Sequence, residues 1–144
     1  MMKFHNKPGI NYFAVVAREK ALLLKHYSFL KCEIKGNVLY CYGSCQPAEG
    51  CVVYNYRIKY DPSTKPVVTV TSPLIVYNDD IHMYPSDNSL CLYHKSDLYW
   101  TSDTHLFNTI IPWTHEWFVF YELWKLTGRW LHPFVPHKGI KIAA

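Results

Sequence analysis

The sequence predicts an α+β fold in which a helix comes first, antiparallel strands follow, and a long helix comes last. Three patterns predict it: amphipathic spacing near the N-terminus, alternation of apolar and polar residues in the middle, and helically spaced aromatic residues near the C-terminus. A chain of 144 residues has the usual size of one domain, so we expect a single domain over residues 1–144. Its 49% hydrophobic content favours one well-packed core.

The N-terminal pattern covers residues 11–27 and follows the helix-breaking pair Pro8-Gly9. Apolar side chains recur there at helical spacing, and charged side chains take the remaining positions. The apolar set is Phe13, Val16, Ala17, Leu22, Leu23 and Leu24, and the charged set is Arg18, Glu19, Lys20 and Lys25. This arrangement predicts a helix that packs one face on the core.

The clearest strand pattern lies at residues 51–60, where every second residue is apolar or aromatic. The segment Asp61-Pro62-Ser63-Thr64 has turn chemistry, and the β-branched run at residues 67–71 follows it. We therefore expect an antiparallel hairpin, with a further strand at residues 38–42.

Near the C-terminus, aromatic residues fall at positions i, i+4, i+7, i+8 and i+11 of a helix. They are Trp113, Trp117, Phe120, Tyr121 and Trp124. Pro112 suits the first turn of this helix, and Gly128 is placed to end it. The pattern predicts a long helix with these aromatic residues on its core face.

Charge and composition argue against several classes of function. The net charge of +4 comes from 15 basic and 11 acidic residues that are scattered, whereas a nucleic-acid surface clusters its Lys and Arg. A basic nucleic-acid-binding module is therefore a weaker rival interpretation. We expect no secretory leader and no membrane span, and hence a cytoplasmic protein whose five cysteines stay reduced.

The sequence favours neither a metal site nor a nucleotide cofactor. Cys41, Cys45 and Cys51 lack a fourth ligand at a familiar spacing, so they are interpreted as small buried side chains. His82, His132 and His137 match no metal-binding motif. No glycine-rich phosphate loop is present in the sequence either.

Cys91 differs from the other cysteines because it lies in an irregular stretch, residues 72–103, and not on a regular apolar stripe. Long irregular segments within a compact domain are often functional. The pattern alone fits two interpretations equally well. In one, Cys91 presents its sulfur at a surface; in the other, Leu90, Cys91 and Leu92 together fill the core.

The order of motifs around Cys91 resembles ubiquitin-conjugating enzymes. The motifs are Ser72-Pro73-Leu74-Ile75-Val76, Ile81-His82, Leu90-Cys91-Leu92 and Trp100. Downstream, the blocks Ile111-Pro112-Trp113-Thr114-His115-Glu116-Trp117, Tyr121-Glu122-Leu123-Trp124 and Thr127-Gly128-Arg129-Trp130 are similar to the bacterial branch of that family. That branch includes proteins of antiphage operons that also encode a cyclic-oligonucleotide synthase. The resemblance implies a four-stranded antiparallel meander between the N-terminal helix and the active-site segment.

The resemblance also implies a transferase chemistry. Cys91 would carry an acyl group as a thioester and pass it to an amine, and His82 would hold the active-site segment through hydrogen bonds. Tyr93 and Trp100 would shape the groove, and His137 matches a histidine of the bacterial branch.

One departure from the family pattern concerns the His-Pro-Asn tripeptide. His82 is followed by Met83 and Tyr84, so the asparagine that helps to stabilise the oxyanion is missing from its usual place. Asn88, or backbone N–H groups around Cys91, would be the substitutes.

The implied partner is another protein. The acyl donor would be the C-terminus of the cyclic-oligonucleotide synthase or a ubiquitin-like protein, and the sequence does not choose between them. The alternative is a non-catalytic variant of the same fold that binds a partner without using Cys91. The oligomeric state is not predicted.

Overall fold

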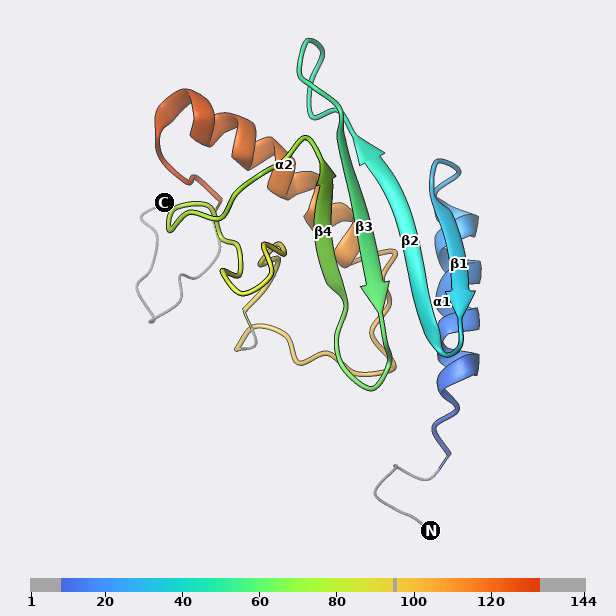
Figure 1. Cartoon of the computed structure of the whole chain (residues 1–144). Helices are drawn as coiled ribbons and strands as arrows, with labels where there is room; N and C mark the ends of the chain where they lie inside the picture. The colour runs from blue at the N-terminus through green and yellow to red at the C-terminus, as the bar shows by residue number, and fades with distance from the viewer. Residues whose placement is uncertain (1–8, 95, 133–144) are drawn as a thin grey trace.

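The computed structural model describes residues 9–94 and 96–132, and Figure 1 shows two helices and one sheet. The elements in chain order are α1 (Tyr12–His26), β1 (Lys31–Lys35), β2 (Val38–Cys45), β3 (Tyr54–Tyr60), β4 (Val67–Ser72) and α2 (Ile110–Thr127). The expected α+β fold with a four-stranded meander is confirmed. Between β4 and α2 the chain is largely irregular, as the sequence predicts.

The four strands lie side by side in chain order, and every neighbouring pair is antiparallel. The predicted alternation is confirmed over β3, where Tyr54, Tyr56, Ile58 and Tyr60 are buried and the residues between them are not. The strand begins at Tyr54 and not at residue 51 as predicted, and Val52 is exposed. The sheet therefore has one covered face and one face toward solvent.

The residue pattern alone does not reveal β1. This strand reads Lys-Cys-Glu-Ile-Lys, pairs only with β2, and leaves its charged residues exposed. Such an edge strand lacks the apolar content that marks a strand in a sequence. Gly36 (φ +62°) lies in the tight turn to β2, in the left-handed region that glycine adopts without strain.

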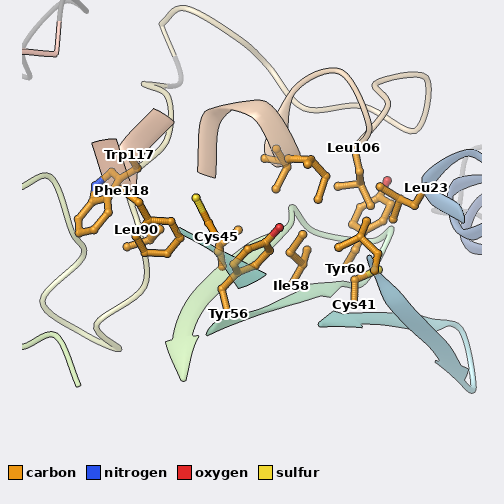
Figure 2. Packing of buried hydrophobic residues seen from close by; sticks show 14 of the residues in the cluster. Leu23, Cys41, Cys45, Tyr56, Ile58, Tyr60, Leu90, Leu106, Trp117 and Phe118 are labelled. Atoms are coloured by element: carbon orange, nitrogen blue, oxygen red, sulfur yellow. The ribbon is translucent and has the colours of Figure 1, made fainter. Parts of the chain in front are cut away.

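Both helices lie behind the sheet in the view of Figure 1. Buried side chains from α1, the sheet, the irregular segment and α2 form one hydrophobic cluster, part of which Figure 2 shows. Leu23 of α1 and Phe118 of α2 are both fully buried in it. The core therefore lies between the sheet and the two helices.

Helix α1 begins where the sequence predicts, because the Asn11 side chain caps it by accepting a hydrogen bond from the Ala14 amide (3.0 Å). Its buried face differs in detail from the prediction. Phe13 is 54% exposed, whereas Glu19, assigned to the polar face, is fully buried. The carboxylate of Glu19 is buried because it binds groups from a distant loop, as described below.

Helix α2 is confirmed, but its buried face is rotated from the predicted one. The buried residues are Ile110, Ile111, Thr114, Trp117 and Phe118. Of the five predicted aromatic residues, Trp117 is buried, and Trp113, Tyr121 and Trp124 are partly buried against the core. Ile110 and Ile111, which precede Pro112 and lie outside the predicted aromatic set, belong to the buried face, so that face begins earlier in the helix than predicted. Gly128 ends the helix in a left-handed conformation (φ +75°), as predicted.

Candidate functional site

The segment that leads to Cys91 is attached to the edge of the sheet beyond β4. The Leu90 amide donates to the Val68 carbonyl (2.9 Å), and the Tyr84 amide donates to the Ser89 carbonyl (2.9 Å). These bonds give residues 89 and 90 the backbone pairing of a short strand. The sheet therefore fixes the position of the backbone immediately before Cys91.

On the other side, Cys91 is held by the backbone of His82. The Cys91 amide donates to the His82 carbonyl (3.0 Å). That carbonyl also accepts a bond from Trp117 Nε1 (3.2 Å), and the same indole N–H is 3.1 Å from the Ile81 carbonyl oxygen. Because Trp117 belongs to α2, the sheet and the second helix together position the cysteine.

The main chain and the ring of His82 make different contacts. Its φ of +52° is unusual for a residue with a side chain, and it lets the carbonyl meet Cys91 and Trp117. The ring packs against Trp130, with centroids 5.5 Å apart. These contacts describe how His82 holds the segment, and its role in a reaction stays a prediction.

The Cys91 side chain is buried, with 2% of its surface exposed. The partly exposed sulfur that the sequence allowed is therefore not what the structure shows. Burial raises the pKa of the Cys91 thiol, whereas a hydrogen bond from Tyr84 and the charge of Lys65 act to lower it. The Cys91 Sγ also lies 3.8 Å from the Tyr93 carbonyl oxygen.

Tyr84 and Lys65 are residues of this site that the sequence analysis missed. Tyr84, through its hydroxyl, and Lys65, through its charge, both act to lower the pKa of the Cys91 thiol, and the Lys65 ammonium lies 5.0 Å from the centroid of the Tyr84 ring. Both side chains line an open cavity of about 250 Å³ together with Leu90 and Leu92. Lys65 lies in the turn before β4, so only the folded chain brings it to Cys91.

The aromatic rings of Tyr93 and Trp100 lie next to each other beside this cavity. Their rings stack with centroids 6.2 Å apart, and Trp100 Nε1 donates to the Tyr60 hydroxyl (3.2 Å). Both line a second cavity of about 790 Å³, to which Lys65 also contributes. Lys65 and Tyr93 border both cavities, so the two cavities adjoin there.

Asn88 and the backbone near Cys91 were the predicted oxyanion donors. The Asn88 side-chain oxygen accepts a hydrogen bond from the Tyr77 amide (3.3 Å). The backbone of Asn88 is left-handed (φ +58°), and its amide closes a turn by donating to the Tyr84 carbonyl. The amides of Leu90 and Cys91 are engaged by the Val68 and His82 carbonyls. Those two N–H groups are therefore already hydrogen-bonded within the protein. The role of Asn88 as a donor to an oxyanion stays a prediction.

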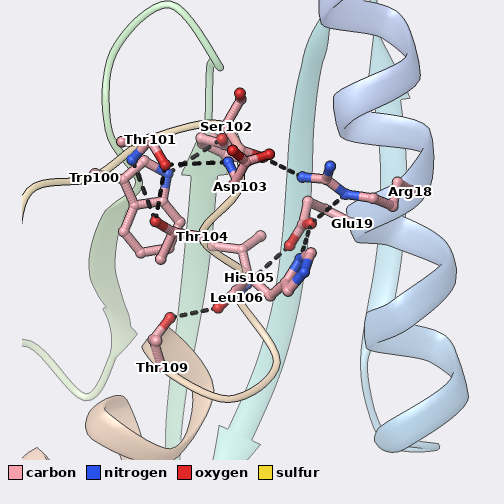
Figure 3. A network of polar contacts seen from close by, with 11 residues as sticks. Arg18, Glu19, Trp100, Thr101, Ser102, Asp103, Thr104, His105, Leu106 and Thr109 are labelled. Atoms are coloured by element: carbon pink, nitrogen blue, oxygen red, sulfur yellow. Dashed lines mark hydrogen bonds and ion pairs between the residues drawn. The ribbon is translucent and has the colours of Figure 1, made fainter.

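A buried carboxylate ties the irregular segment to α1, as Figure 3 shows. Glu19 accepts bonds from Arg18 Nε (2.9 Å), His105 Nδ1 (2.8 Å) and the Leu106 amide (2.9 Å). Arg18 also donates to the Ser102 carbonyl. This network fixes the stretch between Trp100 and α2, and helical spacing could not reveal it because its partners are more than 80 residues apart in the sequence.

Two further histidines were singled out from the sequence, His132 and His137. His137 lies outside the described residues. His132 Nε2 is 2.6 Å from a Glu116 carboxylate oxygen.

Among the described residues, no group of three or more His, Cys, Asp or Glu side chains is arranged to hold a metal ion. None of the helices built from those residues has the length and apolarity needed to cross a bilayer.

Comparison with known proteins gives one family. The family model described as Type II CBASS E2 protein matches residues 19–138, which include the sheet, the Cys91 segment and α2. The search of curated proteins returned no match.

Proposed function

Because the chain belongs to the Type II CBASS E2 family, an E2-like group of antiphage systems, we propose that Cys91 carries an acyl group as a thioester and passes it to an amine. The donor is the C-terminus of a protein partner, either the cyclic-oligonucleotide synthase of the system or a ubiquitin-like protein. The observation that carries the proposal is the convergence on Cys91 of the sheet edge, which holds Leu90, and the His82 carbonyl, which also binds Trp117 of α2.

The reaction needs a thiolate, an activated acyl group and an amine. The Cys91 thiolate attacks the acyl carbonyl, whose leaving group departs, and a C–S bond forms. The amine then attacks this thioester, the C–S bond breaks with its electron pair returning to sulfur, and the nitrogen loses a proton to solvent. A thioester is reactive enough toward amines that a strong general base at the site is not essential.

The two adjoining cavities support a protein donor. One lies over Leu90 and Leu92, and the other extends from Lys65 and Tyr93 along Trp100 toward Tyr12 at the start of α1. An extended chain end that reached Cys91 would be bordered by aromatic rings and one cation. The sulfur of Cys91 is buried in the folded chain and must be uncovered for this.

Trapping with serine tests the proposal. We expect Cys91→Ser to form an oxyester with the donor, because a hydroxyl in the same place makes an ester that thiols do not cleave. Co-expression with the neighbouring genes, followed by intact-mass analysis, should show a stable adduct in Cys91→Ser and none in Cys91→Ala. Cys51→Ser is the matched control, since Cys51 is a half-buried cysteine outside this site.

The alternative is a non-catalytic member of the same fold that binds a partner without using the cysteine. Two observations favour it: the low exposure of Cys91 and the absence of an asparagine two residues after His82, where the His-Pro-Asn tripeptide has one. It predicts that Cys91→Ala binds the partner as the wild type does, and that neither wild type nor Cys91→Ser forms an adduct. That result would replace the transferase proposal.

A further inference from the structure

Two cysteines face each other in the first hairpin of the sheet. Cys32 of β1 and Cys41 of β2 are partners in the antiparallel register, and their sulfur atoms lie 3.2 Å apart as free thiols. The Cys91 segment is attached beyond β4, at the opposite edge of the sheet. We propose that Cys32 and Cys41 form a redox site, separate from the proposed acyl carrier, at which a peroxide closes an intramolecular disulfide.

The backbone of this hairpin already has the spacing of a disulfide. Residues directly opposite each other on antiparallel strands have Cα atoms about 4.5–5.5 Å apart, and disulfides span Cα separations of about 4.4–6.8 Å. The register runs without a break from Lys31 opposite Tyr42 to Lys35 opposite Val38. Since an S–S bond is about 2.05 Å long, the two sulfur atoms need to approach by only about 1 Å, and the strands can keep their pairing.

The two thiols differ in access and in ionisation. Cys41 is fully buried in the hydrophobic core, as Figure 2 shows, whereas Cys32 is half-buried and packs against that core from the edge strand. The Cys41 thiol donates a hydrogen bond to the Cys32 sulfur. That bond lowers the pKa of the Cys32 thiol against the effect of burial, the charge of Lys20 on α1 lowers it further, and the pKa of the Cys41 thiol is raised. Cys32 is therefore the thiol that an oxidant reaches and that ionises first.

The oxidation runs in two balanced steps. The Cys32 thiolate attacks one oxygen of hydrogen peroxide, the O–O bond breaks, and Cys32 becomes a sulfenic acid while hydroxide leaves and takes up the proton that the thiol released. The Cys41 sulfur then attacks the sulfenic sulfur, the S–O bond breaks, and water leaves with the Cys41 proton as the S–S bond forms. The two sulfur atoms together lose two electrons, which the peroxide gains, and two waters are produced. A dithiol reductant reverses the bridge by thiol–disulfide exchange.

The other cysteines provide the comparison within the same chain. Burial raises the pKa of the Cys91 thiol, and it raises the pKa of Cys45 to about 11, so both are poorer nucleophiles toward peroxide. Cys51 is half-buried as Cys32 is, and it lies in the loop between β2 and β3. Cys51→Ser is therefore the matched control for Cys32→Ser.

The test is peroxide titration of the full chain, reduced beforehand. After the peroxide is removed with catalase, the protein is unfolded, its thiols are alkylated with iodoacetamide, and intact mass and non-reducing peptide maps are recorded. We expect the wild type to lose two of its five alkylatable thiols, to yield one peptide pair joined through Cys32 and Cys41, and to regain all five thiols with dithiothreitol. Cys91 should still be alkylated in the bridged form.

The variants identify which sulfur reacts first. Cys51→Ser should form the bridge as the wild type does, and Cys32→Ser should not form it. Cys41→Ala should stop at the sulfenic acid on Cys32, which dimedone captures as a stable adduct.

The wild-type measurement decides the inference even if a variant fails to fold. A wild type that keeps five alkylatable thiols, oxidises Cys32 further without a bridge, or forms its disulfide through Cys51, Cys91 or a second molecule would overturn it. The outcome is independent of acyl carriage, because loading of Cys91 is measured on the reduced protein and does not involve this pair.

Discussion

At the scale of single residues, His115 has a titration that the fold controls. Its Nε2 is joined to the buried Tyr56 hydroxyl by a hydrogen bond of 2.8 Å, and its ring packs against Tyr56 and Phe29. Burial lowers the pKa of His115 from its usual value near 6.5. The folded protein therefore binds a proton on this imidazole only at a lower pH than the unfolded chain does.

The consequence is a loss of stability in mild acid. The unfolded chain protonates His115 at higher pH than the folded chain does, so unfolding takes up a proton between the two pKa values. Above about pH 6.5 neither state binds that proton and stability is unaffected by it. We expect the melting temperature to fall as pH drops below this value, and to fall less steeply in His115→Gln. Parallel pH profiles of the two proteins would contradict this account.

At the scale of elements, Trp117 connects α2 to the segment that carries Cys91. It is 2% exposed, and its indole N–H bonds to the carbonyls of Ile81 and His82. Trp124, one of the predicted core residues, is only half-buried, and its buried Nε1 has no hydrogen-bond partner among the described residues. The two tryptophans on one helix therefore differ in burial and in bonding.

Urea denaturation should separate the two. Trp117→Ala should lower the free energy of unfolding by about 3–5 kcal/mol, because it leaves a cavity and removes two hydrogen bonds. Trp124→Ala should cost about 1 kcal/mol. Equal losses in the two variants would mean that α2 is not anchored through Trp117.

The helices and strands differ in how well the local residue pattern predicts them. Helices α1 and α2 and strand β3 were predictable because their apolar spacing or their capping residues are local signals. The edge strand β1 and the rotated face of α2 were not, because burial there depends on what each element packs against. Glu19 shows this best, since its charge is buried only because residues 105 and 106 reach it.

At the scale of the whole molecule, the candidate site is assembled from parts that are far apart in the chain. The resemblance singled out Cys91 and His82 from one stretch of sequence. Lys65 comes from the β3–β4 turn and Trp117 from α2, and only folding brings them to that stretch. The low exposure of Cys91 has the same origin, because the sheet edge and Trp117 of α2 meet at its backbone only in the folded chain.

Intact-mass spectrometry of the wild-type protein, co-expressed with its genomic neighbours, tests acyl carriage on Cys91 most directly. We expect a mass increase that maps to Cys91, disappears on treatment with thiol, and is also released by hydroxylamine, which excludes a disulfide. An adduct on another cysteine, or no adduct with any neighbour, would contradict it.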